Sequence, residues 1–185
     1  MKHAWMDERI FLAINASVVF GLLAGCSADS MNKGSSVAVP DIAEVLNEYD
    51  AWTPVLNGDV AFTSAGHGGV LVRSYLGPKT KIHLDTAATP YPLPEGALLA
   101  KAVVNDANAP GAQASRLYIM RKEAPGFDPD NGDWSYYLAK RKEGKLELDP
   151  TVGVREKACV LCHIKFKQFD NVQTVDFFLN QRVGG

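Results

Sequence analysis

Two cysteines and a histidine near the end of the sequence form the pattern that most directly implies chemistry. Cys159, Cys162 and His163 stand in the segment Cys-Val-Leu-Cys-His. On a helical turn the two thiols lie on one side, where they can add to the two vinyl groups of a haem, and the adjacent imidazole can bind the iron. The sequence therefore predicts one covalent haem c per chain, with Cys159 and Cys162 as thioether attachments and His163 as the axial iron ligand.

Three other interpretations of this segment stay open. A pair of cysteines at this spacing also forms a simple disulfide or a thioredoxin-like redox site, although that motif usually opens a helix near the start of its fold. A tetrahedral zinc site would need two more ligands, for which His67 and His83 are the best candidates. The third interpretation is a chance histidine after an unremarkable cysteine pair.

The remaining cysteine, Cys26, follows an apolar run at residues 10–24. A helix of that length would span roughly 22 Å, short of a hydrocarbon layer of roughly 30 Å, which is typical of a signal peptide. The segment Leu-Ala-Gly-Cys that ends at Cys26 resembles the bacterial lipobox, in which the cysteine is acylated. An ordinary signal peptide or an uncleaved anchor is the alternative.

This pattern predicts three parts of the chain: a lipoprotein signal peptide at residues 1–25, a flexible tether at 26–39 and a haem domain at 40–185. Ser27 follows the cysteine, where an aspartate would favour inner-membrane retention, so we expect a periplasm-facing protein anchored to the outer membrane through lipidated Cys26. With 19 basic and 21 acidic residues, the sequence indicates no nucleic-acid partner. Its mean hydropathy near zero and its 9% aromatic content argue against both a mostly disordered chain and a polytopic membrane protein.

The elements that must position the haem motif are those of an α+β domain, a mainly antiparallel sheet with an N-terminal helix and a C-terminal haem-binding helix. Asp41 can cap the first helix. Alternating apolar residues predict strands at 69–76 and 97–104 and a hairpin at 115–139. The prolines between the first two strands, Pro78, Pro90, Pro92 and Pro94, predict loop and strand edge. An apolar segment at 172–179 is expected to cover the sheet or a partner subunit.

The second axial position of the iron has no compelling ligand in the sequence. Met31 lies in the predicted tether, and Met120 is expected to belong to the core. His67 stands in a glycine-rich turn, where a histidine is usually solvated, and His83 follows a basic loop. We therefore expect an iron that is open on one side, where it can bind small ligands or perform chemistry.

Several motifs in order along the chain resemble the cytochrome P460 family. They are His67-Gly68-Gly69 before a strand, the segment 91–97 before the next strand, Met120-Arg121-Lys122, Asn131-Gly132-Asp133-Trp134 and the closing Cys159 to His163. The match spans residues 40 to 180. The resemblance implies a largely β-sheet mono-haem cytochrome, often a homodimer, with a five-coordinate iron. Some members oxidise hydroxylamine with a haem crosslinked to a lysine, and relatives without the crosslink bind nitric oxide and similar gases.

Lys101 is the candidate for that crosslink. Alternation in the predicted strand puts it on the same face as the apolar residues Leu99 and Val103. A desolvated lysine amine loses its proton readily and becomes a nucleophile. The alternatives are an edge strand with its lysine in water, or a structural lysine of the fold. Lys79 and Lys81 are the other candidate crosslinkers.

A basic cluster surrounds the haem motif. Its members are Arg155, Lys157, Lys165 and Lys167. They can neutralise haem propionates, dock an acidic redox partner protein, or form the wet face of a helix.

The sequence thus predicts an exported, lipid-anchored cytochrome that performs redox chemistry on small nitrogen compounds of the hydroxylamine or nitric oxide type. A non-enzymatic electron carrier or gas binder is the alternative, so the sequence leaves open whether the chain is an enzyme. A zinc-stabilised lipoprotein interaction domain is the weaker alternative.

Overall fold

The computed structural model describes residues 40–183. The predicted signal peptide, the tether with Met31, and Cys26 lie outside these residues. The helices are α1 (Ile42–Glu48), α2 (Pro78–Thr86), α3 (Lys157–His163) and α4 (Gln173–Val183). The strands are β1 (Thr53–Pro54), β2 (Phe62–Ser64), β3 (Val70–Leu76), β4 (Leu98–Val103), β5 (Arg116–Lys122), β6 (Trp134–Lys142) and β7 (Lys145–Leu148).

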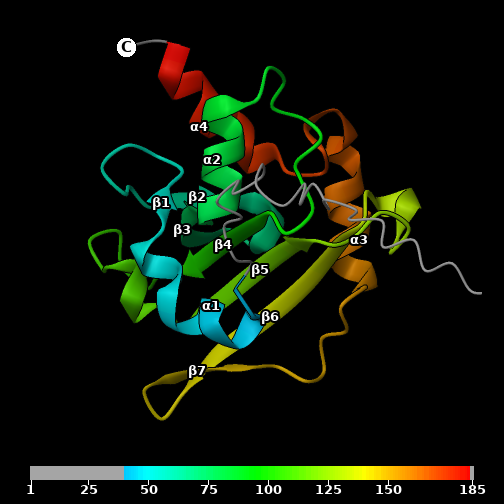
Figure 1. The fold of residues 1–185 in the computed structure, drawn as a ribbon. Coiled ribbons are helices and arrows are strands. Elements are labelled where there is room, and N and C mark those ends of the chain that lie inside the picture. Colours follow the sequence, from blue (N-terminus) through cyan, green and yellow to red (C-terminus); the bar gives the residue numbers. More distant parts are fainter. Residues whose placement is uncertain (1–39, 184–185) are drawn as a thin grey trace, which may run out of the picture. The chain divides into compact units, whose positions relative to one another are not determined.

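The strands form one antiparallel sheet in the order β1-β3-β4-β5-β6-β7, and β2 pairs with β3 beside β1 (Figure 1). The predicted strands at 69–76 and 97–104 correspond to β3 and β4. The predicted hairpin at 115–139 is β5 paired with β6. An α+β fold with a mostly antiparallel sheet and a C-terminal helix is thereby confirmed. The strands β1, β2 and β7 are additional to the prediction.

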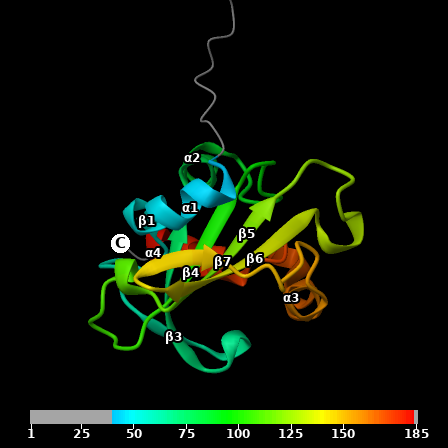
Figure 2. The same ribbon diagram turned by 90° about the horizontal axis from the view of Figure 1, so that it is seen from below.

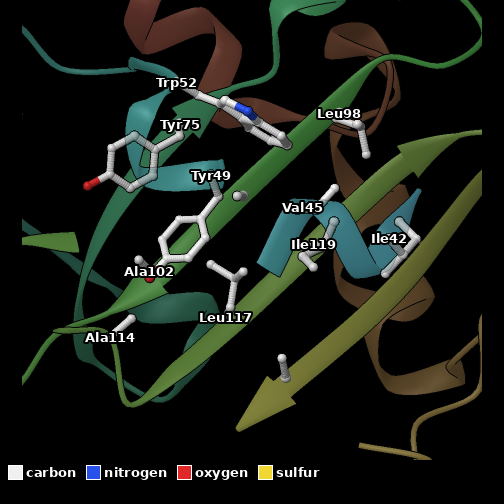
Figure 3. Close-up of a cluster of buried hydrophobic side chains, with 12 residues drawn as sticks. Ile42, Val45, Tyr49, Trp52, Tyr75, Leu98, Ala102, Ala114, Leu117 and Ile119 are labelled. Atoms are coloured by element: carbon white, nitrogen blue, oxygen red, sulfur yellow. The ribbon is translucent and has the colours of Figure 1, made fainter. Parts of the chain in front are cut away.

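Helix α1 begins where the sequence predicts it, because Asp41 caps it. The Asp41 amide donates to the Glu44 carboxylate at 3.1 Å, which forms half of a capping box. Ile42 and Val45 then face one side of the sheet, where they join Leu117 and the other side chains of a buried cluster (Figure 3). The local capping signal and the burial of one helix face therefore both favour a helix at residues 42–48.

The opposite face of the sheet carries a second core. Leu76, Leu99, Met120 and Tyr136 are directly paired across β3, β4, β5 and β6, and all four are buried. Val175 and Phe178 of α4 pack into the same cluster, so the predicted apolar segment covers the sheet. Met120 is 8% exposed, as expected of a core residue. Figure 2 shows the strands between α1 and the C-terminal helices α3 and α4.

The expectation that Pro78 lies in loop or strand edge is wrong, because Pro78 begins α2. Proline is favourable in the first turn of a helix, where its missing N–H has no partner to lose. Thr80 ties the helix to β4 through bonds of 2.9 and 2.8 Å to the Leu98 carbonyl and amide. Pro90, Pro92 and Pro94 do lie in the loop before β4. Within residues 40–183, no helix has the length and apolarity needed to cross a membrane.

Candidate functional site

Helix α3 carries the three residues of the predicted haem motif. Cys159, Cys162 and His163 are all half-buried, and both thiols are free. The Glu156 carboxylate accepts a hydrogen bond from the Ala158 amide at 3.3 Å and so caps the start of the helix. The spacing of three residues places the two sulfurs on neighbouring positions of one helical turn, as thioether attachment to a single group requires.

The imidazole of His163 is held by a backbone carbonyl. Its Nδ1 lies 2.8 Å from the Asn171 carbonyl oxygen, which can only accept, so Nδ1 carries the proton and donates. Nε2 is then the nitrogen with a free lone pair, as for most metal-binding histidines. Burial lowers the pKa of His163, so the ring stays neutral and available as a ligand.

The Asn171 carbonyl reaches His163 because the two residues after the 3-10 segment Ile164–Phe169 adopt left-handed backbone conformations. Asp170 has a φ of 51° and Asn171 a φ of 64°. The Asp170 carboxylate accepts two bonds from Lys122 Nζ, at 2.7 and 2.8 Å, and one from the Leu93 amide at 2.9 Å. Trp134 Nε1 donates to the Asp170 carbonyl at 2.8 Å. Strands β5 and β6 therefore fix the peptide that orients His163.

Lys101 lies in the middle of the sheet, on the face toward α3. Strand β4 pairs with β3 on one side and β5 on the other, so the alternative of an edge strand with its lysine in water is wrong. Ser74 and Tyr118 flank Lys101 in register and form one polar row across the sheet. Lys101 Nζ makes no hydrogen bond or ion pair with the described residues. Burial lowers its pKa to about 8, which makes the neutral, nucleophilic amine readily accessible.

His67 lies beside Lys101 and His163 and lines the same cavities, although the sequence predicts a solvated histidine. It ends a 3-10 turn (Ala65–His67) between β2 and β3. Its ring centroid lies 4.5 Å from that of Tyr118 and 6.4 Å from that of His163. Nδ1 is 2.8 Å from the Ser64 hydroxyl. Burial, followed by the charges of Lys101 and His163, lowers the pKa of His67 to about 4, so the ring is neutral.

Two cavities meet at these residues. A small one of about 40 Å³ reaches Cys159, and a larger recess of about 360 Å³ reaches Cys162. His67, Lys101 and His163 line both. The recess has the size of a cofactor site.

Two buried hydroxyls at the small cavity have no hydrogen-bond partner among the described residues. They belong to Ser74, in the row of Lys101, and to Tyr136, whose ring lies 5.4 Å from that of His163. A buried hydroxyl without a partner costs free energy, which a bound polar group would recover. The free thiols, the open Nε2 of His163, the recess and these hydroxyls together fit a haem with a small ligand beside it.

The other candidate residues lie elsewhere. His83 is in α2, with Nε2 3.2 Å from the Pro90 carbonyl. Lys79 and Lys81 are also in α2, where Lys81 pairs with Asp85. The four basic residues around the motif are all exposed, which agrees with a wet helix face or a docking surface. No group of three or more histidine, cysteine, aspartate or glutamate side chains within 40–183 is arranged to hold a metal ion by itself.

Sequence reasoning missed Asn171, Ser74 and Tyr136. Ser74 could have been found from the strand register, because it lies directly opposite Lys101. Tyr136 could not be found in this way, because its partner in the register is Met120, which the sequence assigns to the core. Asn171 carries no comparable signal, since its role depends on a backbone carbonyl.

No protein-family model and no curated protein matches this sequence. The residues that can hold a cofactor or react are Cys159, Cys162, His163, Lys101 and His67, which line the two cavities.

Proposed function

We propose that the chain is a mono-haem c-type cytochrome that performs redox chemistry on small nitrogen compounds, of the hydroxylamine or nitric oxide type. The observation that carries the proposal is the geometry of α3. Cys159 and Cys162 share one helical turn at two adjoining cavities, and His163 has Nδ1 bound to the Asn171 carbonyl with Nε2 left for iron. The resemblance to the cytochrome P460 family supports the same proposal.

The chain's own residues then have distinct roles. When bound, haem supplies an iron that changes oxidation state and binds small ligands. The two cysteines hold it, and the Asn171 carbonyl keeps the His163 ring in one orientation. The small cavity admits only a molecule of a few atoms, to which the Ser74 and Tyr136 hydroxyls can donate hydrogen bonds. Lys101 offers an amine that exchanges its proton near neutral pH.

Electron transfer is the second candidate function. Leu161 is 59% exposed on α3, beside the exposed Lys157 and Lys165. An apolar centre with a basic rim is typical of a docking surface for an acidic redox partner. On this alternative the same surface delivers electrons to or from the cofactor, and no substrate is turned over.

We further propose a periplasm-facing protein held at the outer membrane through lipidated Cys26, and a homodimer in solution. These proposals rest on the lipobox-like sequence and on the resemblance. Globomycin, an inhibitor of lipoprotein signal peptidase, should cause the precursor to accumulate in cells. A precursor that is processed normally in its presence would contradict lipidation.

The haem proposal is tested on the full chain expressed in a bacterium that matures c-type cytochromes. We expect a Soret band and a haem stain that persists on a denaturing gel, because thioether bonds survive denaturation. Absence of both would refute haem attachment and leave a zinc or disulfide protein. Turnover of hydroxylamine with an added electron acceptor separates the enzyme from the electron carrier.

Lys101 provides a prediction about the cofactor bond. If its amine is bonded to the porphyrin, the ferrous absorption band is strongly red-shifted, and mass spectrometry joins the haem peptide to the peptide that contains Lys101. The variant Lys101→Met should then show an ordinary c-type spectrum while it keeps its haem. Lys81→Met is the matched control, because Lys81 pairs with Asp85 in α2. A red-shifted band that survives Lys101→Met would contradict the role of Lys101.

A further inference from the structure

The turn that contains His67 packs against helix α3, which carries Cys159, Cys162 and His163. The backbone amides of Gly68 and Gly69 bond the carbonyls of Ala65 and Ser64, which closes the tip of the β2–β3 hairpin. A Cβ added at Gly66 would lie 3.6 Å from Cys162 Sγ. The hairpin tip therefore reaches α3, and His67 arrives beside His163 from a different part of the chain.

The side chains of His67 and His163 each have one ring nitrogen, Nδ1, in a hydrogen bond. Nδ1 of His163 is hydrogen-bonded to the Asn171 carbonyl, and Nδ1 of His67 is hydrogen-bonded to the Ser64 hydroxyl oxygen. When Nδ1–H is the donor in both bonds, both Nε2 atoms keep a free lone pair. No hydrogen bond from either Nε2 is found within residues 40–183. The ring packing of His67 on Tyr118, at 4.5 Å between centroids, restricts its orientation further.

The separation of the rings matches two ligands on one metal ion. Metal–imidazole bonds of about 2.0–2.1 Å on opposite sides of an ion place the two ring centroids roughly 6 Å apart. The centroids of His67 and His163 are 6.4 Å apart. A histidine that contacts an iron-bound molecule without binding the iron would stand farther away, because the molecule must fit between them.

We propose that His67 Nε2 occupies the sixth coordination position of the iron held by His163, and that a small molecule must displace it to bind. This inference rests on the proposed function. The sequence predicts an iron with a free sixth position, whereas here His67 fills that position until a small molecule displaces it. The turn around His67 suits such a switch, since Gly68 and Gly69 have φ values of 80° and 73° and no atom lies within 4 Å of a Cβ at either position. The side chain can leave while the hairpin strands stay paired.

The test uses the full-length ferric holoprotein and its spin state. We expect the wild type to show a low-spin, six-coordinate absorption and electron paramagnetic resonance spectrum. His67→Ala should be high-spin, and added imidazole should restore the low-spin spectrum. His67→Phe keeps a ring against Tyr118 without a metal-binding nitrogen, so it should also be high-spin if the alanine variant folds poorly. His83→Ala, a histidine of α2, is the matched control and should remain low-spin.

A second measurement tests displacement. Cyanide should bind ferric His67→Ala with an apparent affinity at least about tenfold higher than wild type, because no internal ligand competes for the iron. A high-spin wild type, or a low-spin His67→Phe variant, would overturn the inference and leave the proposed function intact. A protein without a Soret band would instead refute the proposed function itself.

Discussion

Replacing Cys159 and Cys162 together with alanine is expected to abolish covalent haem attachment. Both thioether bonds are lost, so any haem that still binds His163 is removed by denaturation. The readout is haem staining after a denaturing gel, compared with the amount of protein. Each single variant should keep a reduced amount, because one thioether bond suffices to retain the group. Undiminished staining in the double variant would contradict the assignment of these thiols.

Cys26→Ala is the matched control for this double variant. Cys26 lies outside the described domain and is predicted to carry lipid, so its loss should leave haem staining unchanged while the protein no longer incorporates a labelled fatty acid. A loss of haem in this variant would show that export, and not attachment chemistry, limits the measurement. The two experiments therefore separate the two kinds of cysteine.

The same double variant should be much less stable to heat than the holoprotein. The two thiols are free, so the domain relies on its two cores and on whatever fills the recess of about 360 Å³. A ligand that binds only the folded state stabilises it. For a domain of this size each kcal/mol shifts the melting temperature by about 2–4 °C, so loss of a buried cofactor is easily measured. Equal melting temperatures would argue against a buried haem.

The elements predicted correctly are those whose signal is local. Asp41 caps α1 through neighbouring backbone, and alternation along residues 115–139 is enough to indicate β5 and β6. Pro78 also has a local signal, because it stands in the first turn of α2 after Gly77 as N-cap, where proline is favourable. Proline disfavours the interior of a helix but favours its first turn, and the position after Gly77 is such a first turn.

The site was only partly predictable because its geometry is made by contacts between distant segments. The glycine-rich sequence around His67 correctly indicates a turn, but the place that the turn reaches is set by the pairing of Ser64 with Val70 and by packing on α3. The carbonyl of Asn171 reaches His163 only because consecutive non-glycine residues adopt positive φ. Tertiary partners stabilise that rare conformation, and no local pattern marks it.

The second large effect is expected at the nearly buried ion pair between Lys122 and Asp170. Their side chains are only 11% and 10% exposed. Lys122→Met removes the cation and leaves the Asp170 carboxylate buried with the Leu93 amide as its remaining donor. Removing one member of a buried pair costs about 3–5 kcal/mol, so we expect a loss of that size in the free energy of unfolding, measured by urea denaturation. Lys122 also lies over the Trp134 ring at 5.1 Å, a contact that the variant loses as well.

Lys142→Met is the matched control, because Lys142 pairs with Glu147 at 3.9 Å on the surface, with side chains 63% and 56% exposed. An exposed pair of this kind contributes about 0–1 kcal/mol. Lys122→Met should also shift the reduction potential of the holoprotein, because Asp170 positions the Asn171 carbonyl and that carbonyl orients the iron ligand His163. The control should leave the potential unchanged. Equal losses of stability in the two variants, or an unchanged potential in Lys122→Met, would show that the ion pair does not position the ligand.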